Sequence, residues 1–308
     1  MKVIISFVVA SLSIFGGYAL AGGQMYLLMQ PAEYLIIVGG AAAAFYLGTG
    51  SKTMSLIRRT LKNSFRRESQ TDDYLQVMGL LHDLLTKLSR EGMIAVEADI
   101  ERPESSPLFD RYPSVMQDRA TLEFITDYLR MMVTSKLTGS QIQNAMDDEI
   151  NTRRKENDKA SGALYRTADA LPAFGIMAAV MGVVHVMGSV GQVSNAELGV
   201  MIGSALVGTF VGVLFAYAYV GPLAQFVENR LSENIKKLEC IQAILVAHIG
   251  HGFSPALAVE FGRKTLYSGV RPSFDEMEAH LRGLRGAGVG SQSNSSPPMG
   301  QSNVFQAR

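Results

Sequence analysis

Four long apolar runs alternate with charged segments along this chain of 308 residues. The runs cover residues 3–21, 34–48, 172–187 and 198–220. A helix rises about 1.5 Å per residue, and roughly 20 apolar residues are needed to cross the hydrocarbon core of a bilayer. The runs therefore predict four transmembrane helices. Only a few polar residues separate the last two runs, which predicts a tight helical hairpin.

The long charged segment between the second and third runs has the periodicity of water-soluble helices. Apolar residues recur at three- and four-residue steps in 74–88 and again in 120–137, which gives each segment one apolar face. A further helix is expected over 139–153. Prolines between residues 103 and 113 predict a break between the first two helices, because proline disrupts a helix interior.

Two longer helices are expected to join the membrane to the aqueous phase. Residues 151–166 are strongly polar and lead without interruption into the third run, so one continuous helix should rise into the bilayer. Residues 225–250 predict a second helix that leaves the membrane after the fourth run. The final stretch, 286–308, is rich in Gly, Ser, Asn and Pro and predicts a disordered tail.

The distribution of Lys and Arg predicts the orientation of the spans, since juxtamembrane positive charges stay on the cytoplasmic side. Neither short connection, 22–33 or 189–197, contains a Lys or Arg. Basic residues instead crowd the end of the second run: Lys52, Arg58, Arg59, Lys62, Arg66 and Arg67. Both termini and the long charged segment are therefore expected in the cytoplasm.

The first run also has features of a signal peptide. Lys2 precedes it, and it ends in the cleavage-like sequence Ala-Leu-Ala at 19–21. Its apolar core is longer than the usual 7 to 15 residues of a signal peptide, which favours an uncleaved helix.

The predicted fold is an all-α integral membrane protein with four transmembrane helices and a large cytoplasmic helical domain between the second and third. The expected divisions are a peripheral hairpin over 1–50, a cytoplasmic domain over 51–170, a pore-lining hairpin over 171–222, C-terminal cytoplasmic helices over 223–285 and the tail over 286–308.

Composition agrees with a membrane protein and argues against an enzyme. The 28 basic and 28 acidic residues balance, and the mean hydropathy is +0.14. The single cysteine, Cys240, excludes an intramolecular disulfide and is expected to be a packing residue. The five histidines lack metal-ligand spacing, and no catalytic constellation is visible, so neither a cofactor nor a metal is expected.

Small residues line the predicted hairpin at helical spacing. They are Ser204, Gly208, Gly212 and Ala216 in the fourth run and Gly175, Ala178 or Ala179, and Gly182 in the third. Such faces let helices approach closely in a membrane. One interpretation is plain helix packing, and the other is that both faces hold a partner helix while letting it turn.

Three further residues of the hairpin are candidates for coupling. Pro172 and Pro222 lie at the cytoplasmic ends of the two spans, where each is either a helix-end signal or a soft joint. Thr209 is the polar residue expected to face a pore, although a threonine can also bond its own backbone.

A carboxylate in the middle of a span is missing from this chain. Proton relays in membranes ordinarily use a buried acid, and here Glu33 and Asp169 lie only at the edges of the runs. If the chain takes part in ion movement, a second subunit is expected to supply the titrating group.

Several motifs carry a resemblance to a known family. They are Gln-Pro-Ala-Glu at 30–33, Leu-Pro-Ala-Phe-Gly-Ile at 171–176, Ala-Val-Met-Gly-Val-Val-His at 179–185, Val-Gly-Thr-Phe at 207–210 and Val-Glu-Phe-Gly-Arg-Lys-Thr-Leu-Tyr at 259–267. With them the chain resembles the MotA family of flagellar motor stator proteins, from the first span to about residue 284.

The resemblance implies a homopentamer in the bacterial inner membrane around two copies of MotB, whose transmembrane Asp would carry the proton. It further implies that the cytoplasmic segment engages the rotor protein FliG, with Arg90 and Glu97 as the rotor-facing base and acid. Pro172 and Pro222 resemble the prolines that couple ion binding to movement. Sodium-driven relatives place a Thr where this chain has Ala179, so protons are the expected ion.

Two other classes of function remain open. An energising subunit of the ExbB or TolQ type shares the hairpin and its small-residue faces, but it has three spans rather than four. A non-conducting membrane scaffold would use the cytoplasmic segment as a binding domain. A deletion strain separates the three: paralysed flagella indicate a stator, loss of iron-complex uptake indicates an energising subunit, and neither defect leaves the scaffold.

Overall fold

The computed structural model describes residues 2–64, 70–135 and 137–289, and within these ranges every regular element is a helix. Four helices are long and apolar enough to cross a membrane, which confirms the predicted fold class. The chain divides into two compact units, one made of Met1–Arg67 and Ala145–Lys236 and the other of Glu68–Asn144 and Lys237–Arg308. Each unit is therefore made of two separate stretches of the chain.

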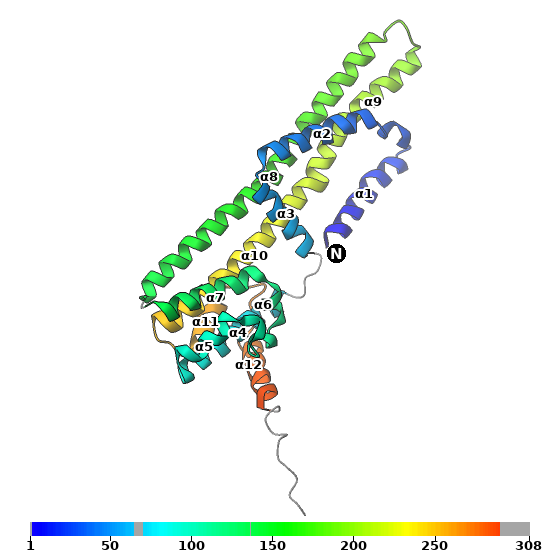
Figure 1. Cartoon of the computed structure of the whole chain (residues 1–308). Coiled ribbons are helices and arrows are strands. Elements are labelled where there is room, and N and C mark those ends of the chain that lie inside the picture. The colour runs from blue at the N-terminus through cyan, green and yellow to red at the C-terminus, as the bar shows by residue number, and fades with distance from the viewer. Residues whose placement is uncertain (1, 65–69, 136, 290–308) are drawn as a thin grey trace, which may run out of the picture. The chain divides into compact units, whose positions relative to one another are not determined.

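The first unit contains the apolar helices (Figure 1). In chain order it contains α1 (Lys2–Leu20), the 3₁₀ turn η1 (Met25–Leu28), α2 (Pro31–Gly48), α3 (Ser51–Ser64), most of α8 (Gly139–Gly188), α9 (Asn195–Leu214), the π-helical segment η4 (Phe215–Val220) and the first part of α10 (Gly221–Leu245). The length of α8 confirms that one continuous helix rises into the third span. Two of the basic residues placed beside the second span, Arg66 and Arg67, lie outside the described residues.

Two apolar cores hold the first unit together. One joins α2 to the spans of α8 and α9 through Ile37, Ala41, Leu171, Ala178, Val207, Val211 and Ala216. The other joins α3 to α8 and α10 through Ile57, Ala160, Leu164, Ala224, Val227 and Leu231. The connection between α8 and α9 is closed by a capping box, in which the Ser194 hydroxyl accepts a hydrogen bond from the Glu197 N–H and the Glu197 carboxylate accepts one from the Ser194 N–H.

The second unit is a helical domain. It contains α4 (Gln70–Glu91), α5 (Met93–Glu101), α6 (Pro113–Gln117), α7 (Arg119–Thr134), α11 (Pro255–Thr265) and α12 (Phe274–Val289), with short 3₁₀ turns at Pro103–Ser105 and Phe109–Arg111 and a π segment η5 at Val246–Gly250. The predicted apolar faces form its core, since Leu81, Leu85, Ile125 and Leu129 are buried. Cys240 is buried as well.

Two details of the helices go beyond the sequence expectations. Between α4 and α7, where the prolines predict a break, the chain forms α5, α6 and two 3₁₀ turns, and Pro103 and Pro113 occupy first-turn positions where the missing N–H costs nothing. At the C-terminal end, α12 continues to Val289, beyond the expected start of the tail at residue 286. The remainder of the tail lies outside the described residues.

Candidate functional site

The small-residue faces of α8 and α9 pack against each other within one chain. A Cβ atom added at Gly175 would lie 2.7 Å from the carbonyl oxygen of Gly208 and 3.0 Å from the Cα of Gly212. A Cβ at Gly212 would lie 2.7 Å from the carbonyl oxygen of Leu171. Neighbours this close are backbone atoms that cannot rotate away, so only glycine fits.

The same geometry extends toward the turn of the hairpin. A Cβ at Gly182 would lie 2.7 Å from the Cβ of Ala205, and one at Gly208 would lie 3.0 Å from the Cβ of Ala178. The sequence leaves open whether Gly175, Gly182, Gly208 and Gly212 pack helices within the chain or receive a partner's helix. In the structure the two helices of the hairpin pack on each other at these glycines.

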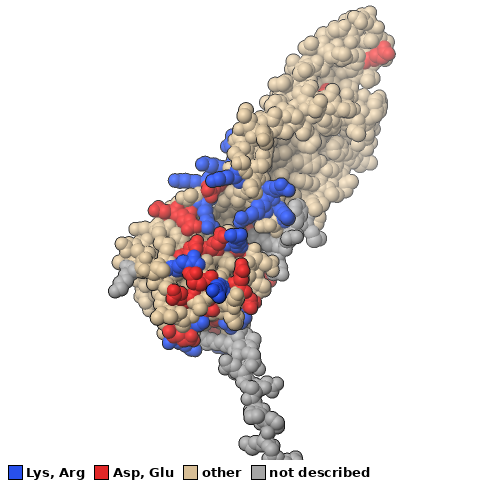
Figure 2. Space-filling view, in the orientation of Figure 1, with Lys and Arg blue, Asp and Glu red and all other residues tan. Residues whose placement is uncertain are grey.

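The opposite surfaces of these helices are apolar and exposed. On α8 they present Ile176, Met177, Val180, Met181, Val184 and Met187, and on α9 they present Val200, Ile202, Leu206, Phe210 and Val213. Figure 2 shows the first unit as a surface almost without charged residues where its apolar helices lie. Because contiguous apolar surface of this extent is not left in water, lipid or another apolar helix must cover it.

Ala179 and Thr209 lie on different sides of the contact between the helices. Ala179 is 8% exposed and its backbone approaches Gly208, so it belongs to the packed side. Thr209 is half-buried, and no hydrogen bond from its hydroxyl occurs within the described residues. Its hydroxyl is therefore available to a group from outside the chain.

The two candidate prolines occupy unlike positions. Pro172 lies inside α8, next to the buried Leu171 whose carbonyl faces Gly212. Pro222 is exposed in the first turn of α10, directly after the π segment η4. Proline inside a helix removes one backbone hydrogen bond, and a π segment widens the turn, so each span has a weakened helical ladder near one end.

The π segment also carries contacts that the sequence did not predict. The Tyr219 hydroxyl and the Ser11 hydroxyl of α1 are 2.7 Å apart, and the Tyr219 ring meets Phe7 edge to face at 5.3 Å between centroids. Phe215 similarly meets Tyr34 of α2 at 6.4 Å. These aromatic contacts hold α1 and α2 against the end of the fourth span.

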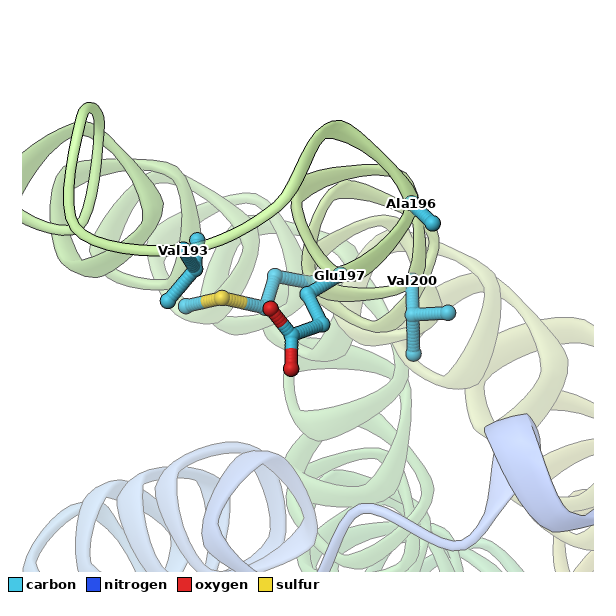
Figure 3. A pocket seen from close by; sticks show the side chains of 5 residues that line it. Val193, Ala196, Glu197 and Val200 are labelled. Atoms are coloured by element: carbon cyan, nitrogen blue, oxygen red, sulfur yellow. The ribbon is translucent and has the colours of Figure 1, made fainter.

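A shallow apolar hollow lies at the turn between α8 and α9. Figure 3 shows Val193, Ala196, Glu197 and Val200 around it, with Met201 completing the lining. The Glu197 carboxylate is its only charged group and is already engaged in the capping box. The hollow therefore offers no group that could bind an ion specifically.

In the second unit, Arg90 and Glu97 lie close together in the sequence on two consecutive helices. Arg90 lies in the last turn of α4 and Glu97 lies on α5, and the turn between the helices uses Gly92 at a φ of +84°. Both side chains are exposed, and neither forms an ion pair within the described residues. Beside them Ile94 is 84% exposed, an unusual position for a large apolar side chain.

A partly buried ion pair joins these two helices to each other. The Lys87 ammonium lies 2.7 Å from the Asp99 carboxylate, which also accepts a 2.7 Å hydrogen bond from the Ser106 hydroxyl. Since Lys87 belongs to α4 and Asp99 to α5, the pair sets how Arg90 and Glu97 are presented.

A second polar cluster contacts α4 one turn before Lys87. Asp83 accepts a hydrogen bond of 2.8 Å from the Tyr112 hydroxyl and lies 3.2 Å from both His82 and Arg111. Burial alone would raise the pKa of Asp83, but the hydrogen bonds from His82 and Tyr112 and the charge of Arg111 hold this pKa below its usual value. Burial lowers the pKa of the nearby His280 of α12, so its imidazole favours the neutral form.

Within the described residues, no group of three or more His, Cys, Asp or Glu side chains could hold a metal ion. The candidate groups among the described residues are the exposed charges on α4 and α5, the helix segments near Pro172 and Pro222, and the acid Glu33, which is buried beside the hairpin.

Comparisons with known proteins agree over nearly the whole chain. The sequence model described as the motility protein A N-terminal family matches residues 4–92, and that of the MotA/TolQ/ExbB proton channel family matches residues 117–240. Motility protein A of Salmonella typhimurium and that of Escherichia coli are each 40% identical over 286 residues, which is 92% of this chain and 96% of the relative. Chemotaxis protein LafT of Vibrio parahaemolyticus is 35% identical over 269 residues, 87% of this chain and 94% of its own.

Solved structures share the fold. A chain of the structure of Campylobacter jejuni MotAB superposes with a TM-score of 0.72 at 19% identity, covering 89% of this chain and 98% of that one. A chain of the flagellar MotAB stator complex from Bacillus subtilis gives a TM-score of 0.68 at 20% identity, covering 90% and 98%.

Proposed function

Because this chain belongs to the motility protein A family, we propose that it couples proton flow to rotation as the membrane subunit of a flagellar stator. The observation that most supports this function is the 40% identity to motility protein A over 92% of the chain. The match of residues 4–92 to the family's own N-terminal model favours a stator over an ExbB or TolQ energising subunit or a passive scaffold.

The partner in this proposal is MotB, which the solved structures of the same fold contain by their titles. Two features of the chain support a partner helix in the membrane. The hairpin exposes apolar faces on both α8 and α9, and the Thr209 hydroxyl has no acceptor within the described residues. MotB would supply the titrating transmembrane Asp, and five copies of this chain would surround two copies of MotB.

Proton binding would be coupled to movement where the backbone hydrogen bonding of each span is weakened. When the partner's carboxylate binds or releases a proton, its contact with the exposed side of α8 and α9 changes. Backbone hydrogen bonding is already interrupted at Pro172 within α8 and at η4 beside Pro222. Each helix can therefore bend at these positions with little further loss of hydrogen bonds. Ala179 lacks an oxygen ligand for Na⁺, which supports protons as the ion.

Arg90 and Glu97 would contact the rotor protein FliG. This role is supported by the exposure of both side chains and by the lack of an ion pair with either among the described residues. A charge already paired within the chain would gain little from a charged partner. Exposed charges act over about a Debye length, roughly 8 Å at physiological salt, so each contact must form anew as the rotor passes.

The orientation in this proposal places both termini in the cytoplasm of a bacterium, with the protein in the inner membrane. Lys52, Arg58, Arg59 and Lys62 are exposed on α3, directly after the second span, and such residues stay on the cytoplasmic side.

A deletion strain tests the function. Cells that lack this chain should remain flagellated but be unable to swim, and expression of the chain should restore swimming. A protonophore should then stop the complemented cells, whereas removal of sodium should not. Normal swimming in the deletion strain, or swimming that follows the sodium gradient, would contradict the proposal.

A further inference from the structure

Glu33 occupies a core position in the first unit, although it lies near the end of a span. The buried residues of α2 are Glu33, Ile37 and Ala41, which recur every four residues on one face. Ile37 and Ala41 pack in the apolar core formed with α8 and α9. Glu33 continues this stripe and is only 9% exposed, so its carboxyl group is directed into the same interface.

The atoms around the carboxyl group come from the contact between α8 and α9. A Cβ added at Gly182 would lie 3.6 Å from Glu33 Oε1 and 2.7 Å from the Cβ of Ala205. Glu33 Oε2 is buried and has no hydrogen-bond partner. The acid therefore lies against the contact between the two helices of the hairpin.

Among the described residues, no cation pairs with Glu33. Residues 3–51 and 167–229, which include every span, contain no Lys or Arg. Three titratable side chains lie on the helices packed around this site: Tyr34 next to Glu33 on α2, the exposed His185 near Gly182 on α8, and Glu197 at the start of α9. None of them forms an ion pair with Glu33. A buried carboxylate without a counter-ion costs several kcal/mol even after relaxation, whereas a protonated carboxyl group does not carry that penalty.

We propose that Glu33 is a proton-binding site of this subunit, and that its carboxyl group holds and exchanges a proton as the stator turns. Proton binding by Glu33 is argued from this chain alone. The exchange of that proton as the stator turns rests on the proposed function and deepens it. Proton release would place a charge against Gly182 and Ala205, where α8 and α9 touch, and would thereby weaken the contact between the helices. Binding the proton again would restore it.

Glu33→Gln is the main test, since the amide keeps the size of the side chain and cannot release a proton. The matched control is Glu197→Gln, which removes an acid at the same end of the hairpin and keeps a residue suited to the capping box. Both variants are expected to assemble as the wild type does. Glu33→Gln should reduce swimming speed at least fivefold and abolish its dependence on external pH, whereas Glu197→Gln should swim normally.

Infrared spectroscopy of the purified stator complex tests proton binding directly. At neutral pH the wild type should show the carbonyl stretching band of a protonated carboxyl group, which Glu33→Gln should lack and Glu33→Asp should shift. If Glu33→Gln fails to assemble, the shift in Glu33→Asp still assigns the band. Absence of the band at neutral pH overturns the proposal, even in cells whose swimming depends on protons. A Glu33→Gln variant that swims normally at every external pH would overturn the exchange of that proton.

Discussion

Adding a single methyl group at Gly175 should separate the two helices of the hairpin. The new Cβ would lie 2.7 Å from the carbonyl oxygen of Gly208 and 3.0 Å from the Cα of Gly212. A normal contact distance is about 3.5 Å, so α8 and α9 would have to move apart by roughly 0.8 Å at this point. Both neighbours are backbone atoms of α9, and no side-chain rotation can relieve the contact.

The expected loss of stability follows from two opposing contributions. Overpacking of a well-packed interface costs about 1–3 kcal/mol, and here the crowded atoms belong to rigid helices. Replacing Gly by Ala inside a helix returns up to about 1 kcal/mol of helix propensity. The net effect of Gly175→Ala should be a destabilisation of about 1–2 kcal/mol, because steric crowding exceeds the gain in propensity.

Thermal unfolding of the purified complex in detergent measures this effect. Gly175→Ala should lower Tm by roughly 2–6 °C, as expected for a chain of this size. Gly199→Ala in α9 is the matched control, because no atom lies within 4 Å of its added Cβ, and its Tm should be unchanged or slightly raised. Equal Tm values for Gly175→Ala and the wild type would refute the conclusion that these glycine faces pack against each other.

Three further predictions address torque and stability. Pro172→Ala restores a continuous helical ladder in α8 and should reduce swimming severalfold without reducing the amount of assembled complex; unchanged torque in a tethered-cell assay would remove Pro172 from the coupling. Arg90→Glu and Glu97→Lys should each abolish most torque with no change in Tm, because both side chains are exposed, whereas Ala substitutions should have a smaller effect. Asp118→Asn leaves the Lys237 ammonium, 3.0 Å away and 5% exposed, without its counter-charge and should cost about 3–5 kcal/mol. Although burial raises the pKa of Asp118, Lys237 holds it below its usual value, so the difference in Tm from wild type should be full at pH 7 and shrink as the pH falls below about 4.

The spans and the amphipathic helices could be predicted because each leaves a local signal. Runs of apolar residues and three- or four-residue periodicity are properties of neighbouring positions in the chain. The expected helix over 120–137 corresponds to α7 at Arg119–Thr134, and the continuous helix into the third span is α8. Residues 225–250 likewise fall within α10 and the π segment η5 that follows it.

The π segment at Phe215–Val220 has no comparable local signal. Its residues continue the apolar run of the fourth span, which predicts an ordinary helix. The wider turn instead makes contacts with residues that are distant in the sequence: Tyr219 contacts Ser11, and Phe215 contacts Tyr34. A pattern of neighbouring residues cannot contain such contacts, so the element was missed although its sequence was correctly placed in a membrane.

The glycine faces show a different limit of sequence reasoning. Four-residue spacing in α9 correctly indicated that another helix approaches closely, but it carried no information about which helix. The spacing would be the same for a neighbour in the same chain and for a helix of a partner. Only the distances between Gly175 and Gly208 show that the neighbour is α8 of the same chain.

Glu33 shows why position along a span does not determine whether an acid is buried. Counted along the chain, Glu33 lies in the first turn of α2 and belongs to the edge of the membrane. Its exposure is nevertheless set by its register with Ile37 and Ala41, which turns it toward α8 and α9. The absence of a carboxylate from the middle of every span therefore does not leave this subunit without an acid in its core. A partner is still needed to carry ions across the membrane, because a single acid at one end of a span cannot bridge a hydrocarbon core of about 30 Å.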